Sequence, residues 1–523
     1  MLLIICAAVL ALYCLLVQPY NYWKLRSVKQ SNPWPLFGDS WRTLFRVMDV
    51  AEVVSFYYNS MPNVRYYGIY QFFKPKLVIS DPELIRRVTV KDFDHFVDHV
   101  AQTNPKSDPL FSKNILNLKG DEWRKMRSTL SAAFTGSKMK IIFGLVSDAA
   151  KDFVDYHENQ QSQVNEVEMK DAFSRFATDV IATSALGVKV NSLAEQNNSF
   201  FQMGKELTEF RFPLVFKMLL LQMFPRIYQY FELQIFRKEV TEFFSNLVHT
   251  TVATREAKGI YRPDMIQILM EASKGIHKDK NEDAIKVDFD AGDEDTEITG
   301  ITQEITTDDM TAQALLFFFA GFDSVSSLLT FATYELAVNG NVQDKLREEI
   351  FDTLEKTNGT ITYEALSNMK YLDMVVSEAL RKWPPFVILG RECTKTYTIK
   401  PTLPEEKTLV ISKGTGIHIP CYAIHHDPKY FPNPEQFDPE RFSAANRSKL
   451  TPYTVLGFGQ GPRSCLGSRF ALMETKIIIF HLLSRLEIVT TERTQIPLKL
   501  SKKFGINIRP EKGLWIGFKK LLL

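Results

Sequence analysis

The ten residues from Phe458 to Gly467 read FGQGPRSCLG, and this stretch says more about the fold than any other part of the chain. Three glycines and one proline among ten residues predict a loop of sharp turns. A helical pattern follows from Ser468 to Ile488, which places Cys465 just ahead of a helix N-terminus. Free backbone N–H groups and the helix dipole favour a thiolate at such a position.

Cys465 has two interpretations at this stage. A thiolate held on a glycine loop, open on one side, is what the axial ligand of a flat metal macrocycle requires, and the Arg463 guanidinium can bind a carboxylate of that macrocycle. A buried, small apolar side chain on a turn is the more common role of a lone cysteine. The other cysteines, at positions 6, 14, 393 and 421, form no Cys-x-x-Cys pair, so neither a disulfide framework nor a multi-cysteine metal site is expected.

The composition is that of a globular chain with a large core. Of the 523 residues, 45% are hydrophobic and 24% are charged, which excludes wholesale disorder. The formal net charge of +2 gives no electrostatic footprint for nucleic acid. The 39 phenylalanines are the one unusual count, and they predict an aromatic-rich interior or pocket.

Residues 1–23 carry no charged side chain and are mostly apolar, which predicts an N-terminal membrane anchor with Tyr20, Tyr22 and Trp23 at the interface. Basic residues follow, so the positive-inside rule leaves the rest of the chain on the cytoplasmic side. A cleaved signal peptide is the competing interpretation, but the basic start and the small-residue cleavage site that it needs are missing.

The patterns after the anchor predict the organisation of the rest. Residues 24–40, which are basic and rich in proline, predict a hinge before a single domain over residues 41–523. Two β-rich runs between residues 64 and 79 predict a hairpin, and helical patterns dominate from there to about residue 385. Short strands are expected over residues 396–422 and near the C-terminus. The predicted fold class is therefore mainly α with small β-sheets (α+β).

Two other segments have distinctive compositions. Acidic residues cluster over residues 276–305 and predict a solvated loop. The apolar island over residues 212–225 is too short to span a membrane, so it is expected either in the core or in contact with a membrane beside the anchor.

The pattern from Thr306 to Asn339 predicts a helix roughly 50 Å long, enough to cross the whole domain. Gly321 lies near its centre, and because glycine costs about 1 kcal/mol against alanine there, something is expected to approach the backbone closely. Asp323 and Ser324 follow in an apolar stretch, where a carboxylate and a hydroxyl are costly unless they are hydrogen-bonded or used.

The Phe458–Gly467 loop resembles the Phe-x-x-Gly-x-Arg-x-Cys-x-Gly haem-binding sequence of the cytochrome P-450 family. The resemblance extends over about residues 30–515 and implies the cytochrome P-450 fold with an N-terminal membrane anchor. It implies that Cys465 binds the iron of haem b (iron protoporphyrin IX). It also implies that Phe458, Arg463 and Gly467 belong to the cofactor site.

Further motifs occur in the order of the same family. Trp123 and Arg127 resemble its Trp-x-x-x-Arg helix, which meets a haem propionate, and Arg391 lies where the family often has another propionate contact. Glu378-x-x-Arg381, together with an arginine at position 441, resembles the family's Glu-x-x-Arg triad. That triad has a structural role beside the haem loop.

The sequence around Asp323 and Ser324 resembles the oxygen-binding groove of the family, in which these two residues would relay protons to bound dioxygen. Ser324 stands where threonine is usual. Serine keeps the hydroxyl but lacks the methyl group that restrains its rotamer, so activity with some leakage of peroxide is expected. Gly457 is a second departure, since proline is common there.

The resemblance implies a monooxygenase that inserts one atom of O2 into an apolar small molecule with NADPH-derived electrons. An NADPH-dependent reductase would dock on basic residues (Arg124, Lys125, Lys138 and Lys140), with cytochrome b5 as a further electron donor. Residues 335–339 and 262–266 resemble insect microsomal members that clear xenobiotics, which implies the endoplasmic reticulum membrane. Phe317, Phe318 and residues 386–389 are candidate pocket walls. The alternatives are a haem-thiolate isomerase or dehydratase that needs no reductase, and a non-catalytic haem sensor.

Overall fold

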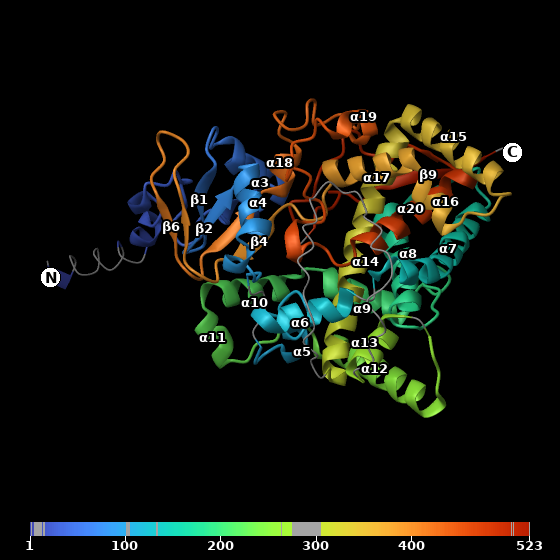
Figure 1. Ribbon diagram of the computed structural model, residues 1–523, viewed down its shortest axis with the longest axis horizontal. Coiled ribbons are helices and arrows are strands. Elements are labelled where there is room, and N and C mark those ends of the chain that lie inside the picture. The colour runs from blue at the N-terminus through green and yellow to red at the C-terminus, as the bar shows by residue number, and fades with distance from the viewer. Residues whose placement is uncertain are drawn as a thin grey trace.

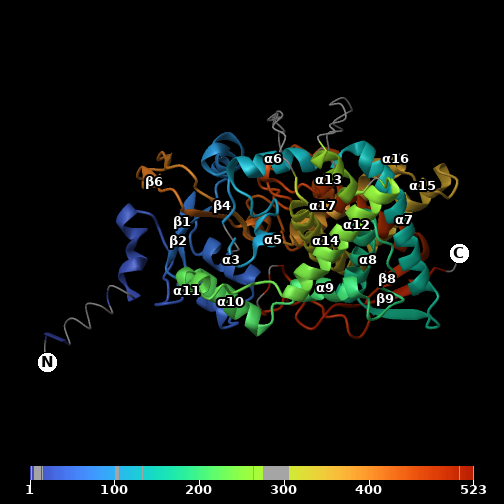
Figure 2. The same ribbon diagram turned by 90° about the horizontal axis from the view of Figure 1, so that it is seen from below.

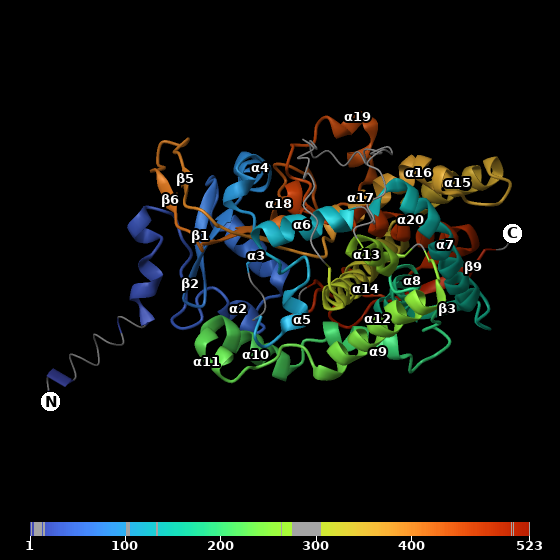
Figure 3. The ribbon, with the colours of Figure 1, turned by 60° about the horizontal axis from the view of Figure 1, so that its bottom comes forward.

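The long helix predicted over residues 306–339 forms the axis of the fold. The computed structural model describes residues 1, 3–4, 13, 16–100, 105–131, 134–262, 264–274, 305–503, 505 and 507–521. Within it, α14 (Thr307–Val338) begins with a capping box made by Thr306 and Asp309. α14 runs through the middle of the helical part (Figures 1 and 3) and packs against α8 (Met169–Ser184) and α12 (Lys238–Lys258).

The other long helices confirm the helical prediction between residues 80 and 385 and extend beyond it. In chain order they are α3 (Val50–Asn59), α6 (Gly120–Ser131), α7 (Gly136–Glu158), α9 (Ser199–Thr208), α10 (Phe212–Met223), α13 (Met265–Ser273), α15 (Gly340–Lys356), α17 (Lys370–Lys382) and α20 (Ser468–Arg485). The short helices that bear on the site are α4 (Pro82–Arg86), α5 (Pro109–Ser112), α11 (Pro225–Tyr230), α18 (Cys421–His425), η6 (Pro439–Phe442) and η7 (Gly461–Arg463).

Three small sheets complete the fold, with strand orders β1-β2-β7-β4, β3-β9-β8 and β5-β6. The strands are β1 (Tyr66–Gln71), β2 (Lys74–Ile79), β3 (Val164–Glu168), β4 (Leu389–Glu392), β5 (Tyr397–Ile399), β6 (Leu409–Ile411), β7 (Gly416–Ile419), β8 (Leu486–Val489) and β9 (Trp515–Lys520). The largest sheet lies toward the N-terminal end of the molecule, and β8 and β9 lie at the opposite end (Figure 2). The predicted mainly helical class with small sheets is confirmed.

The predicted hairpin over residues 64–79 is confirmed as β1 and β2. They pair antiparallel from Tyr66 opposite Ile79 to Gln71 opposite Lys74. The following helix, α4, begins where Asp81 accepts a hydrogen bond from the backbone nitrogen of Leu84 (3.0 Å).

Tyr20 and Trp23 were expected at a membrane interface, but both are buried in the folded body, which corrects that prediction. The Trp23 side chain is 1% exposed, and its Nε1 donates to the carbonyl oxygen of Ile69 (3.3 Å). A Cβ atom on Gly68 would lie 2.2 Å from the Trp23 ring, so this glycine makes room for the indole. The indole ring is already buried against β1 and its N–H already has an acceptor there, so insertion into lipid would not lower its free energy further.

Residues 24–40, predicted as a hinge, are joined to the largest sheet. Isolated bridges connect Gln30 with Gly68 and Gly38 with Gln71. The folded body therefore includes the segment that was predicted to link it to the anchor.

Three further predictions concern the N-terminal anchor, the acidic loop and the apolar island. Among the residues that the structure describes, the helix long and apolar enough to cross a membrane is α14, and 72% of its apolar window is buried in the core. Residues 2, 5–12, 14 and 15 of the predicted anchor lie outside the described residues, as does the predicted acidic loop up to residue 304. The apolar island over residues 212–225 forms α10 and the start of α11.

Candidate functional site

The loop before α20 has the sharp turns that its sequence predicts. The backbone nitrogen of Cys465 donates to the carbonyl oxygen of Phe458 (2.8 Å), which closes the loop on itself. Gly461 has a φ of +71°, and a Cβ there would lie 1.8 Å from the carbonyl oxygen of Thr89, so only glycine fits. Gly467 is the N-cap of α20, and Cys465 is exposed, unlike the buried Cys393 and Cys421.

The electrostatics of Cys465 differ from the sequence prediction. Cys465 is exposed on one side, but the protein atoms around its thiol desolvate the sulfur and raise its pKa, although the backbone N–H of Gly467 and the charge of Arg127 act in the opposite direction. The helix N-terminus therefore does not by itself produce a thiolate. A metal ion bound to the sulfur would supply the missing stabilisation, because a coordinated thiol loses its proton.

One side of α14 is left uncovered by protein. Phe317, Ala320 and Ser324 are exposed or half-buried, whereas most of their helical neighbours are buried. Their spacing of three and four residues puts them on one face. The ring of Phe134 lies 5.8 Å from that of Phe317, and its edge lies 3.8 Å from where a Cβ of Gly467 would be. Phe134 is thus a wall shared by this face of α14 and the end of the Cys465 loop.

The close approach predicted at Gly321 is confirmed. A Cβ on Gly321 would lie 2.5 Å from Cδ1 of Ile181 in α8. The close approach to the α14 backbone therefore comes from a neighbouring helix of the core.

Arg463 stays a predicted carboxylate ligand, and its guanidinium also has partners within the protein. Its guanidinium donates to the carbonyl oxygens of three residues, at 2.8, 3.0 and 2.8 Å: Val97, Ile115 and Leu118. It also lies 4.0 Å above the ring of Trp123, which is 1% exposed. Arg463 therefore ties the loop to the segment that leads into α6.

Arg127 and Arg391 are the other predicted carboxylate ligands. Arg127 donates to the carbonyl oxygen of Ser464 (3.0 Å), one residue before Cys465. Arg391 is 3% exposed, and its Nε is buried without a hydrogen-bond partner. Burial lowers the pKa of Arg391 to about 10. For Arg463, burial and then the charge of Arg391 lower the pKa to about 9.

The positive charges of these arginines act on one another, since the charges of Arg391 and Arg127 both lower the pKa of Arg463. Asp98, at 3.7 Å from Arg463, is the acidic neighbour that opposes their repulsion. His99 adds no charge at neutral pH, because burial and then the charges of Arg391 and Arg463 hold its pKa well below the ordinary range. An excess of buried positive charge with an unpartnered donor favours a bound dianion, and the two propionates of haem meet that requirement.

Asp323 and Ser324 are neighbours in sequence but face different surroundings. Ser324 lies on the uncovered face of α14, and its hydroxyl donates to the carbonyl oxygen of Ala320 (2.7 Å). Asp323 is buried and forms an ion pair with Lys170 (2.8 Å) on α8. Burial alone would raise the pKa of Asp323, but the charges of Lys170 and Arg509 hold it below the ordinary value.

The other partners of Asp323 could not be found by sequence spacing. Asn507 donates to its second carboxylate oxygen (2.7 Å), and Arg509 lies 3.3 Å from the first. These residues and Lys170 come from segments more than 150 residues away in either direction. No local sequence pattern predicts such contacts, because they form only when α8 and the C-terminal segment pack on α14.

The predicted triad is present. Arg381 donates twice to the carboxylate of Glu378, at 2.8 Å each, and Arg441 lies 3.3 Å from the same carboxylate. Glu378 and Arg381 are completely buried. Charges this deep are stable only when every partner is in place, which suits a rigid support for the nearby loop.

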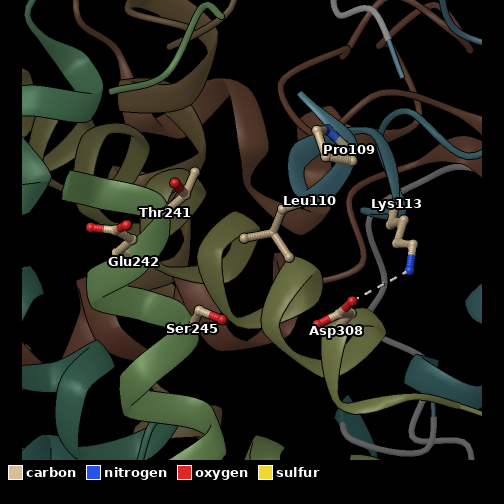
Figure 4. A pocket seen from close by; sticks show the side chains of 7 residues that line it. All are labelled: Pro109, Leu110, Lys113, Thr241, Glu242, Ser245 and Asp308. Atoms are coloured by element: carbon tan, nitrogen blue, oxygen red, sulfur yellow. Dashed lines mark ion pairs between the residues drawn. The ribbon is translucent and has the colours of Figure 1, made fainter. Parts of the chain in front are cut away.

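The pocket shown in Figure 4 is separate from this site. It has a volume of about 260 Å³ and lies between α5, α12 and the start of α14. Lys113 and Asp308 face each other across one side at 3.9 Å. In the part of the chain that the structure describes, no cluster of three His, Cys, Asp or Glu side chains offers a second metal site.

The site combines an accessible thiol, an uncovered face of α14 and a surplus of positive charge from buried arginines. This combination suits a flat macrocycle that carries two negative charges and whose metal accepts one sulfur ligand. The residues present therefore fit haem, and they define the class of haem-thiolate proteins.

Comparison with known proteins agrees with this class. The cytochrome P-450 family model matches residues 31–516, and the chain belongs to that family of haem-containing monooxygenases. It is 43% identical over 527 residues to cytochrome P-450 9e2 of Blattella germanica, covering 98% of this chain and 96% of that protein. It is 37% identical over 506 residues to probable cytochrome P-450 9f2 of Drosophila melanogaster, covering 95% and 94%. Cytochrome P-450 6k1 of Blattella germanica is 34% identical over 505 residues, covering 97% and 94%. The predicted resemblance to insect members is confirmed.

Proposed function

We propose that this chain is a haem b monooxygenase of the endoplasmic reticulum membrane that oxidises lipophilic small molecules, xenobiotics among them, with electrons from NADPH. The single observation that carries the proposal is the accessible Cys465 thiol on its closed loop beside the uncovered face of α14. Haem bound there would supply O2 activation at an iron held by sulfur. The acid–hydroxyl pair Asp323 and Ser324 favours a monooxygenase over a haem-thiolate isomerase or dehydratase.

The residues around the cofactor have distinct proposed roles. Arg127 and Arg391 bind the propionates, whereas Arg463 supports Trp123 and the loop through its three carbonyl contacts. Phe458 and Gly467 shape the loop on either side of Cys465. The Ser324 hydroxyl faces the reaction space, and Asp323 holds a negative charge one residue away while Lys170 keeps it ionised.

An electron donor needs a docking face, and two of the four basic candidates are already paired. Arg124 forms an ion pair with Asp94 (2.6 Å), and Lys140 pairs with Glu364. We therefore assign the larger share of contact with an acidic reductase, and with cytochrome b5, to Lys125 and Lys138.

The test is the difference spectrum of the dithionite-reduced protein with and without carbon monoxide. A strongly red-shifted Soret band is expected from thiolate ligation, and Cys465→Ala should abolish it. Cys393→Ala, which removes a buried thiol elsewhere in the fold, serves as the control and should keep it. A band at the position of histidine-ligated haem in the unmodified chain would contradict the assignment.

A second measurement separates the enzyme from a haem sensor. The monooxygenase consumes NADPH in the presence of reductase and a lipophilic substrate, whereas a sensor binds carbon monoxide and consumes none. An isomerase or dehydratase would turn over a peroxide without reductase.

A further inference from the structure

His425 connects two segments that are far apart in the chain. It is the last residue of α18 and is completely buried, with 0% exposure. Its Nδ1 lies 2.9 Å from the carbonyl oxygen of Arg381, in the last turn of α17. Its Nε2 lies 2.8 Å from the backbone nitrogen of Leu456, two residues before Phe458. The imidazole therefore connects α17, which carries Glu378 and Arg381, to the start of the haem-binding loop.

These two contacts determine the tautomer of His425. The backbone N–H of Leu456 can only donate, so Nε2 accepts and the proton resides on Nδ1, which donates to Arg381. Burial, with the charge of Arg381 acting in the same direction, lowers the pKa of His425 to about 3. The guanidinium of Arg381 in turn donates to the carbonyl oxygen of His425 (3.0 Å).

The backbone continues this connection from Leu456 toward Cys465. The carbonyl oxygen of Leu456 accepts from the nitrogen of Gly459 (2.9 Å), which forms the first turn of the loop. The carbonyl oxygen of Phe458 then accepts from the nitrogen of Cys465 (2.8 Å). The position of Leu456 therefore determines where the first turn of the loop begins, and this loop ends at Cys465.

We propose that His425 is a positioning residue, which anchors the start of the haem-binding loop to α17 and thereby fixes the location of the Cys465 sulfur. Without Nε2 of His425, the buried N–H of Leu456 has no acceptor. Opening of the loop then becomes more favourable, because it lets this N–H donate to water. The proposal rests on the proposed function only for the identity of the iron ligand. The two bonds of the ring are separable by mutation, which makes the proposal testable.

The experiment compares His425→Gln with His425→Asn in the full-length holoprotein. A glutamine amide reaches the place of Nε2 and can accept from Leu456, whereas an asparagine amide reaches only the place of Nδ1 and can donate to Arg381. His426→Gln is the control, since His426 is bonded within its own turn to the carbonyl oxygen of Tyr422 (2.9 Å). The readouts are hydrogen exchange of the peptide containing Leu456 and the fraction of carbon monoxide complex with the red-shifted band.

We expect His425→Asn to speed exchange at Leu456 by about tenfold or more and to lower the red-shifted fraction, because a buried donor loses its partner. His425→Gln should leave both readouts close to the unmodified protein, because the carbonyl oxygen of residue 425 still accepts from Arg381 of α17 and so keeps the anchor. His426→Gln should also leave both unchanged. Equal behaviour of the Gln and Asn variants at position 425 would overturn the proposal. Should His425→Asn not accumulate, His425→Gln decides: retained protection at Leu456 supports the proposal and lost protection overturns it. Hydrogen exchange does not depend on which residue binds iron, so a failure here is distinguishable from a failure of the haem-thiolate assignment.

Discussion

The buried charge on Asp323 is a residue-scale feature with a large expected effect on the free energy of unfolding. Its carboxylate is buried, and Lys170 forms the shortest of its ion pairs. Lys170→Met should destabilise the protein by about 3 kcal/mol, because it leaves a buried charge with fewer partners. Thermal or urea unfolding followed by circular dichroism measures the loss. Lys170→Met with Asp323→Asn should lose much less than Lys170→Met alone, and a double variant as unstable as the sum of the two single variants would reject this account.

The same pair has a defined pH dependence. The pKa of Asp323 is lowered in the folded protein, so its stabilisation is present above the unfolded pKa and is lost as the pH falls. In Lys170→Met, burial is expected to raise the pKa of Asp323, so that variant gains stability as the pH falls through the raised value. The stability difference between the two proteins should therefore narrow toward acid. A difference that widens below pH 5 would contradict the assigned charge state.

At the scale of elements, the contact between α14 and α8 depends on the absence of one side chain. Gly321→Ala should lower the free energy of unfolding by roughly 1 kcal/mol, since overpacking against Ile181 outweighs the better helix propensity of alanine. Ile181→Val removes the Cδ1 that a Cβ would meet, so it should recover most of this loss in the double variant. Gly340→Ala is the control, because a Cβ there would meet nothing within 4 Å. Equal losses at the two glycines would exclude the packing explanation.

The elements that repeat a simple pattern were predicted well from the sequence. α14, the β1–β2 hairpin and the turns around Cys465 follow from periodicity and from glycine and proline positions. The triad was also predicted, because its residues belong to two recognisable motifs. The sequence did not predict the acceptors of Arg463 or the partners of Asp323, because contacts between distant segments determine both.

The same limit explains the N-terminal segment. Tyr20 and Trp23 are residue types that are typical of membrane interfaces. The residue type alone cannot distinguish a lipid headgroup region from the surface of a β-sheet, because both shelter an apolar ring with a polar end. Gly68 on β1 provides the space for the indole, and it lies 45 residues further along the chain. The sequence therefore predicts that these aromatic residues are sheltered, but not by which surface.

At the scale of the whole molecule, the apolar surface of α10 and α11 lies at the same end as the N-terminus (Figures 1 and 3). Gln71 of β1 donates to Gln222 of α10 (3.1 Å), which ties this surface to the sheet that residues 24–40 join. Its exposed apolar side chains include Ile227, which is 46% exposed, and Phe231, which is 64% exposed. If residues 1–17 anchor the chain as the sequence predicts, the same membrane is expected to meet this surface.

This arrangement predicts membrane binding without the anchor. A chain that lacks residues 1–17 should still bind vesicles, and Ile227→Gln with Phe231→Gln should weaken its partition by on the order of tenfold, because each loses apolar area buried in lipid. The matched control is Ile260→Gln with Tyr261→Gln, a pair of similar exposure (46% and 61%) beyond the end of α12. Vesicle sedimentation measures the partition. If both pairs weaken binding equally, or neither does, α10 and α11 do not form a membrane-contacting surface.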